Sequence, residues 1–108
     1  MAGTWAKAAA LADFAGHDTL AVTVAGRKLG LFHVGDQFFA IDNICTHGQA
    51  MLSEGVLEDE VIECPLHAGL FDVRTGRALG APALRDVASY PVRIDGEAIM
   101  VLLPEAAD

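Results

Sequence analysis

A chain of 108 residues has room for one hydrophobic core but little for a large substrate cavity beside it. Hydrophobic residues make up 53% of the chain, yet no apolar run approaches the roughly 20 residues that cross a bilayer. The net charge of -8 argues against binding to nucleic acid or to anionic membranes. The run that follows Lys7 ends at Asp13, too early for a signal-peptide core. We therefore expect one cytoplasmic domain over residues 1–108.

Short runs rich in Val, Leu and Phe are separated by turn signals near both ends of the chain. Residues 20–24, 29–34 and 37–41 are three such runs, and residues 88–94 and 98–103 flank the hairpin signal Asp95-Gly96. Residues 8–16 could form one helical turn, although Ala runs this short are marginal helices on their own. The pattern predicts an all-β protein with an antiparallel scaffold.

The sequence between these runs has a different pattern of residues. From about Asn43 to about Leu84, short apolar segments are interrupted by glycines and by Pro65 and Pro82. These interruptions predict a loop-rich insert within the scaffold.

Two short motifs in the insert carry metal-binding side chains. Cys45-Thr46-His47 is followed, after sixteen residues, by Cys64-Pro65-Leu66-His67. Two thiolates and two imidazoles suit either a structural zinc ion or a [2Fe-2S] cluster with cysteines on one iron and histidines on the other. Zinc modules generally pair Cys with Cys and His with His, whereas here each motif holds one of each. The alternation favours the diiron cluster, and no cysteine remains for a disulfide.

The pattern C-x-H-x16-C-x-x-H, with residues 45–48 and 64–72 around it, resembles the Rieske iron-sulfur signature. The resemblance covers essentially the whole chain. It implies a Rieske fold, in which an antiparallel β-sandwich carries the loop-rich, cluster-binding insert. It also implies one [2Fe-2S] cluster per chain, held by Cys45, His47, Cys64 and His67, with Pro82 in a third loop that covers the cluster.

The resemblance also suggests a low reduction potential. High-potential Rieske proteins carry an extra cysteine in each ligand loop, and Ser and Tyr hydroxyls that donate to sulfur. The matching positions here are Gln49 or a neighbour, Leu66, Gly69 and Phe71. Donors to sulfur stabilise the reduced state and acids oppose it, so we expect a potential near the bottom of the family range.

By resemblance, the nearest group is the soluble ferredoxin component of bacterial aromatic-ring-hydroxylating dioxygenases of the naphthalene, salicylate or biphenyl type. Such a protein is a carrier and not an enzyme, and takes electrons from a flavin-dependent NAD(P)H reductase to the oxygenase. We expect a monomer that docks through the cluster edge, namely His47, His67, Leu66, Leu70 and Pro82. Residues 29–73 hold eight acids and no Lys or Arg, and we expect acids of this segment to steer docking, namely Glu54, Glu58, Asp59, Glu60 and Glu63.

Three alternatives stay open. The chain could be a truncated oxygenase subunit, the small subunit of a nitrite reductase, or a zinc-stabilised binding module. An oxygenase needs a separate 2-His-1-carboxylate iron site, which His17 and His33 cannot supply on so small a domain. We expect His33 to lie on a strand and His17 in a turn, neither of them as a ligand.

Overall fold

The computed structural model describes residues 3–44, 50–65, 69–80 and 85–104. One sheet, in the order β1-β11-β10, contains β1 (Thr4–Ala10), β10 (Val92–Asp95) and β11 (Ala98–Leu103). A second, in the order β2-β3-β4-β9, contains β2 (Thr19–Val24), β3 (Arg27–Val34), β4 (Gln37–Asp42) and β9 (Ser89–Tyr90). The third, in the order β5-β6-β7-β8, contains β5 (Val56–Glu58), β6 (Val61–Glu63), β7 (Leu70–Asp72) and β8 (Ala78–Gly80).

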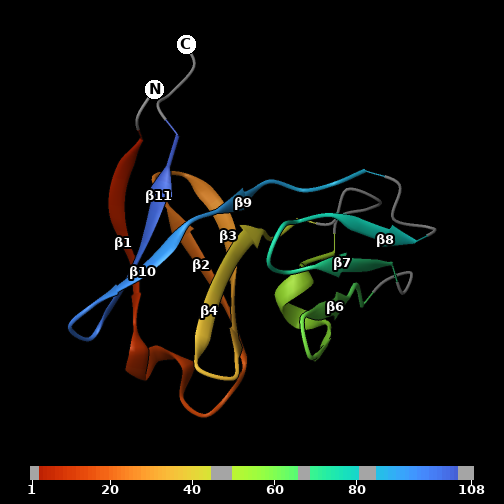
Figure 1. Ribbon diagram of the computed structural model, residues 1–108, viewed down its shortest axis with the longest axis horizontal. Coiled ribbons are helices and arrows are strands. Elements are labelled where there is room, and N and C mark those ends of the chain that lie inside the picture. Colours follow the sequence, from red (N-terminus) through yellow and green to blue (C-terminus); the bar gives the residue numbers. More distant parts are fainter. Residues whose placement is uncertain (1–2, 45–49, 66–68, 81–84, 105–108) are drawn as a thin grey trace.

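The first two sheets form the scaffold, and the third belongs to the insert, on the right in Figure 1. Every pairing between these strands is antiparallel, which confirms the predicted all-β, antiparallel fold class. Two short 3-10 helices are also described, η1 (Leu11–Phe14) and η2 (Leu52–Glu54). Within the described ranges, no helix is long and apolar enough to cross a bilayer.

Strand β3 separates two hydrophobic cores. Leu29 and Leu31 point into a core shared by the two scaffold sheets, with Ile99 and Val101 of β11. Phe32 belongs to a second core, between the scaffold and the insert, with Phe71 of β7. Successive side chains of a strand point to opposite faces, so an unbroken apolar run such as 29–32 suits a strand buried on both sides. This double burial fixes the insert against the scaffold.

The prediction for the N-terminal segment was wrong in part. Residues 8–10 lie in β1, and only Leu11–Phe14 form a short helix. Strand β1 pairs with β11, from Thr4 opposite Leu103 to Ala10 opposite Ala98. Pairing with a strand some 90 residues away in sequence is a tertiary contact that overrides the helix propensity of an Ala run.

The run predicted as one strand over residues 88–94 is divided at Pro91. Strand β9 pairs with β4, in the second sheet, and β10 pairs with β11, in the first. Proline has no N–H to donate to a ladder, so it suits the point where the chain changes sheets. The hairpin at Asp95-Gly96 is confirmed, with Asp95 opposite Ala98.

The insert is more regular than its sequence suggested. Its described part contains a four-stranded sheet whose strands have three residues each. Strands this short carry too little alternation to be recognised in a glycine-rich segment. The limits of the insert near residues 43 and 84 stay a prediction.

Candidate metal centre

Of the four predicted ligands, the structure describes Cys64, whereas Cys45, His47 and His67 lie outside the described residues. Cys64 follows β6, is 2% exposed, and forms no disulfide with any described residue. No group of three or more His, Cys, Asp or Glu side chains within the described ranges is placed to hold a metal ion. The described part of the site is the backbone that flanks each ligand motif.

Residues 45–49 are closed at their base by paired backbone. Ile44 and Met51 form an antiparallel bridge, and the Leu52 N–H donates to the Asn43 carbonyl at 2.7 Å. The segment that carries Cys45 and His47 therefore leaves and rejoins the described structure at one place.

The second motif is closed in the same way. Glu63 pairs with Leu70 across β6 and β7, and the Cys64 N–H donates to the Gly69 carbonyl at 2.7 Å. Residues 66–68, which include His67, lie between these paired positions in sequence. The Cys64 thiol is therefore held next to the base of the segment that carries its partner histidine.

The bases of the two segments are in direct contact through Gly55. A Cβ atom added to Gly55 would lie 1.8 Å from the Glu63 carbonyl oxygen, so the two backbones approach as closely as glycine allows. Gly55 follows η2, which begins at Leu52, and Glu63 precedes Cys64. The Gly55 N–H also donates to the Leu52 carbonyl at 2.9 Å, at the base of the first motif. The bases of both motifs therefore lie close to the ends of β5 and β6 that adjoin Gly55 and Cys64, a region called the ligand edge from here on.

A third segment leaves from this edge as well. Residues 81–84 follow β8, which runs parallel to β6 because both pair antiparallel with β7. The Asp86 carboxylate accepts a bond from the Ala78 N–H at 2.9 Å, and the Val87 N–H donates to the Gly76 carbonyl at 2.8 Å. These bonds close the base of the segment that contains Pro82, which itself lies outside the described residues.

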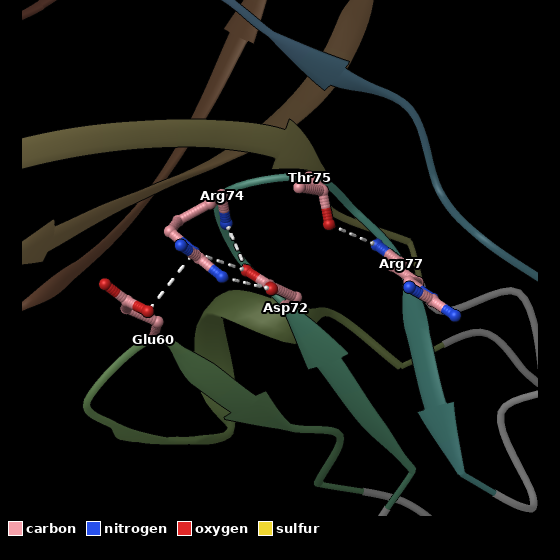
Figure 2. Close-up of polar contacts among 5 residues, drawn as sticks. All are labelled: Glu60, Asp72, Arg74, Thr75 and Arg77. Atoms are coloured by element: carbon pink, nitrogen blue, oxygen red, sulfur yellow. Dashed lines mark hydrogen bonds and ion pairs between the residues drawn. The ribbon is translucent and has the colours of Figure 1, made fainter.

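The opposite edge of the insert sheet is joined by ion pairs, shown in Figure 2. Arg74, between β7 and β8, contacts the Glu60 carboxylate at 3.2 Å and the Asp72 carboxylate at 3.1 Å. Hydrogen bonding from Arg74 holds the pKa of Asp72 below its ordinary value, against the opposing effect of burial. Glu60 is therefore already paired within the chain.

This arrangement predicts a pH-dependent effect of replacing Arg74 with methionine. The lowered pKa of Asp72 means that the ion pair stabilises the folded chain above the ordinary Asp value of 3.8, and that this contribution is lost as pH falls through the lower, folded value. Arg74→Met should therefore lower the free energy of unfolding at pH 7, and the deficit should shrink below about pH 4. Urea unfolding across this range measures it.

Arg77→Met is the matched control, because it removes the same charge from the same connection between β7 and β8. The Arg77 backbone donates to Thr75 Oγ1 at 3.2 Å, and its side chain makes no ion pair with a described residue. An equal, pH-independent deficit in both variants would contradict the assigned role of Arg74.

The predicted docking residues are divided between these two edges. Leu70 is 37% exposed and lies at the ligand edge, while Leu66 and Pro82 lie outside the described residues. Glu63 is exposed on the ligand edge, and Glu54 in η2 is exposed close to it. Glu58 and Asp59 are exposed at the opposite edge, with Glu60. The predicted acidic residues therefore lie at both ends of the short strands β5 and β6, with Glu63 nearest to Cys64.

The two remaining histidines are placed as expected. His33 lies on β3 and stacks on Phe38, with ring centroids 4.1 Å apart. His17 is exposed just after the turn at Ala15 and Gly16. His33 is thus a packed aromatic side chain.

Comparisons with known proteins agree with this geometry. Residues 4–91 match the Rieske [2Fe-2S] domain. The chain is 48% identical over 101 residues to the ferredoxin component of a naphthalene 1,2-dioxygenase system from Pseudomonas aeruginosa, with 94% of this chain and 97% of that protein covered. It is 35% identical, with a TM-score of 0.83, to a chain of the complex of reduced oxygenase and oxidized ferredoxin in carbazole 1,9a-dioxygenase, covering 96% of this chain and 97% of that one.

A further structure shares the fold alone. The small subunit of a protein described as a nitrite reductase is 22% identical, with a TM-score of 0.80, and the alignment covers 93% of this chain and 99% of that one. Cys64 is buried at the ligand edge and forms no disulfide within the described ranges, and the motifs offer two sulfur and two nitrogen donors. These features fit the [2Fe-2S] cluster that the matched domain implies. This chain belongs to the Rieske [2Fe-2S] family.

Proposed function

We propose that the chain is a one-electron carrier between a flavin-dependent NAD(P)H reductase and a terminal aromatic-ring-hydroxylating oxygenase. The observation that carries the proposal is the ligand edge, where the bases of both ligand motifs lie close together. It occurs in a chain 48% identical to a dioxygenase ferredoxin component. Such relatives are electron-transfer components, so the chain alone is expected to turn over no substrate. We place it in the cytoplasm, where NAD(P)H is available and thiols stay reduced.

The ligand set belongs to this proposal. Cys45 and Cys64 would supply thiolates to one iron, and His47 and His67 imidazoles to the other. When bound, the cluster accepts and releases one electron. The protein would hold these four side chains and exclude water from the backbone around them. The burial of Cys64 in the second core supports this role.

A low potential is also part of the proposal. The described positions where high-potential relatives carry hydroxyls are Gly69 and Phe71, both buried and both without a side-chain donor. Fewer hydrogen bonds to sulfur leave the reduced state less stabilised. The reduction potential should therefore lie near the lower end of the Rieske range, which extends from about −150 mV to about +300 mV.

Purified protein tests the function directly. We expect a red-brown protein with a Rieske-type EPR signal after reduction. In a mixture with a reductase and an aromatic-ring oxygenase, product should form only when all three components are present. A colourless protein that contains zinc, or product formation that does not depend on this chain, would overturn the proposal.

Docking at the ligand edge predicts different effects for two acids of the insert. Glu63 adjoins Cys64, whereas Glu58 lies two residues further from Cys64 on the same face of the β5-β6 hairpin. If the oxygenase presents a basic surface, Glu63→Lys should slow electron transfer at low and at moderate salt. Glu58→Lys should slow it less, because a charge about two strand residues, or roughly 7 Å, further from the docked surface interacts with it more weakly.

Glu97→Lys makes the same change of charge on the β10-β11 hairpin, far from the insert (Figure 1). Stopped-flow rates over a salt series compare the three variants. The docking proposal would fail if Glu63→Lys and Glu97→Lys had equal effects.

A further inference from the structure

We infer that Asn43 is a positioning residue for the metal centre, acting with Ser53 to fix the first ligand segment relative to the second. Asn43 lies two residues before Cys45 and is 1% exposed, the most deeply buried polar side chain described. The inference rests on the proposed ligand set and adds a residue that holds no ligand bond itself.

Asn43 and Ser53 are joined reciprocally. The Asn43 side-chain amide donates to Ser53 Oγ at 2.9 Å, and the Ser53 N–H donates to Asn43 Oδ1 at 2.7 Å. Two backbone bonds flank them, from Leu52 N–H to the Asn43 carbonyl at 2.7 Å and from Asn43 N–H to the Lys28 carbonyl at 2.9 Å. Broken buried hydrogen bonds leave unsatisfied groups, which are costly, so this pair resists local opening.

The pair also connects the two ligand segments. Asn43 and Ser53 enclose residues 45–49, and Ser53 lies in η2, which ends beside Gly55. Gly55 contacts the Glu63 carbonyl, and Cys64 follows Glu63. A displacement of Asn43 should therefore change the distance between the bases of the segments that carry Cys45 and Cys64.

The neighbouring strand leaves room for this side chain. Gly30 lies on β3, and a Cβ atom added there would be 2.8 Å from Asn43 Oδ1 and 2.9 Å from the Phe32 ring. Gly30→Ala thus displaces the Asn43 side chain without changing its chemistry. It provides a second perturbation of the same contact.

The test compares the wild-type holoprotein with Asn43→Ala, the milder Ser53→Ala, and Gly30→Ala. The control is Val101→Ala, which removes a fully buried side chain from the scaffold core, away from the ligand edge. Readouts are the EPR g-values, the visible circular dichroism, the reduction potential and the rate at which a chelator removes iron. We expect Asn43→Ala to lose iron roughly 10-fold faster than the control, with altered g-values and potential.

The outcomes separate this inference from the proposed function. If the wild-type protein holds no [2Fe-2S] cluster, the proposed function fails and the inference with it. If the wild type holds the cluster and all three variants match Val101→Ala in g-values, potential and iron loss, the inference alone fails. If Asn43→Ala does not fold, Ser53→Ala and Gly30→Ala decide by the same comparison.

Discussion

A chain with Cys64 replaced by serine is expected to purify without visible colour and without a Rieske EPR signal. Serine is a poor substitute for a thiolate that binds iron, and a cluster needs all four ligands. Because metal binding contributes to folding, the insert should also unfold at lower urea concentration than in the wild type. Absorbance, iron content and urea unfolding measure these effects.

Two further variants separate a ligand from a buried packing residue. Cys64 also packs in the second core, where a cysteine can serve simply as a small hydrophobic side chain. In that case Cys64→Ala would retain the colour that Cys64→Ser loses. Val73→Ala truncates another fully buried member of this core and should stay coloured. A red-brown Cys64→Ala protein would contradict the ligand assignment.

Replacing Gly55 with alanine should be strongly destabilising, although it leaves the ligands intact. The added Cβ would lie 1.8 Å from the Glu63 carbonyl oxygen, and backbone cannot move aside cheaply. Forcing apart η2 and β6 should cost about 3 kcal/mol or more. It should also separate the two ligand segments, so we expect a large loss of bound iron together with the loss of stability.

Gly96→Ala is the control, because nothing lies within 4 Å of its added Cβ. Gly96 has a φ of +65°, so alanine there should cost about 1 to 2 kcal/mol through backbone strain alone. Its iron content should equal that of the wild type. Equal iron content in Gly55→Ala would show that the close contact does not position the ligand segments.

The sequence by itself determined the chemistry of the centre and most of the scaffold. Two Cys/His motifs with unlike donors in each favoured a [2Fe-2S] cluster over zinc, and their resemblance to the Rieske signature identified the kind of cluster. The strands β2, β3 and β4 were predictable because their apolar runs are bounded by turn signals such as Gly35-Asp36. These signals are local.

Only the tertiary structure decided how the backbone at the bases of the two ligand motifs is brought together. The contact between Gly55 and Glu63, the buried pair Asn43 and Ser53, and the pairing of β1 with β11 each join residues that no local pattern connects. The tertiary structure also forms the ion pair between Glu60 and Arg74, and it places the predicted acidic residues at both ends of the insert strands. Such contacts depend on backbone approach and on burial, which arise from packing across the fold and cannot be seen in composition or spacing.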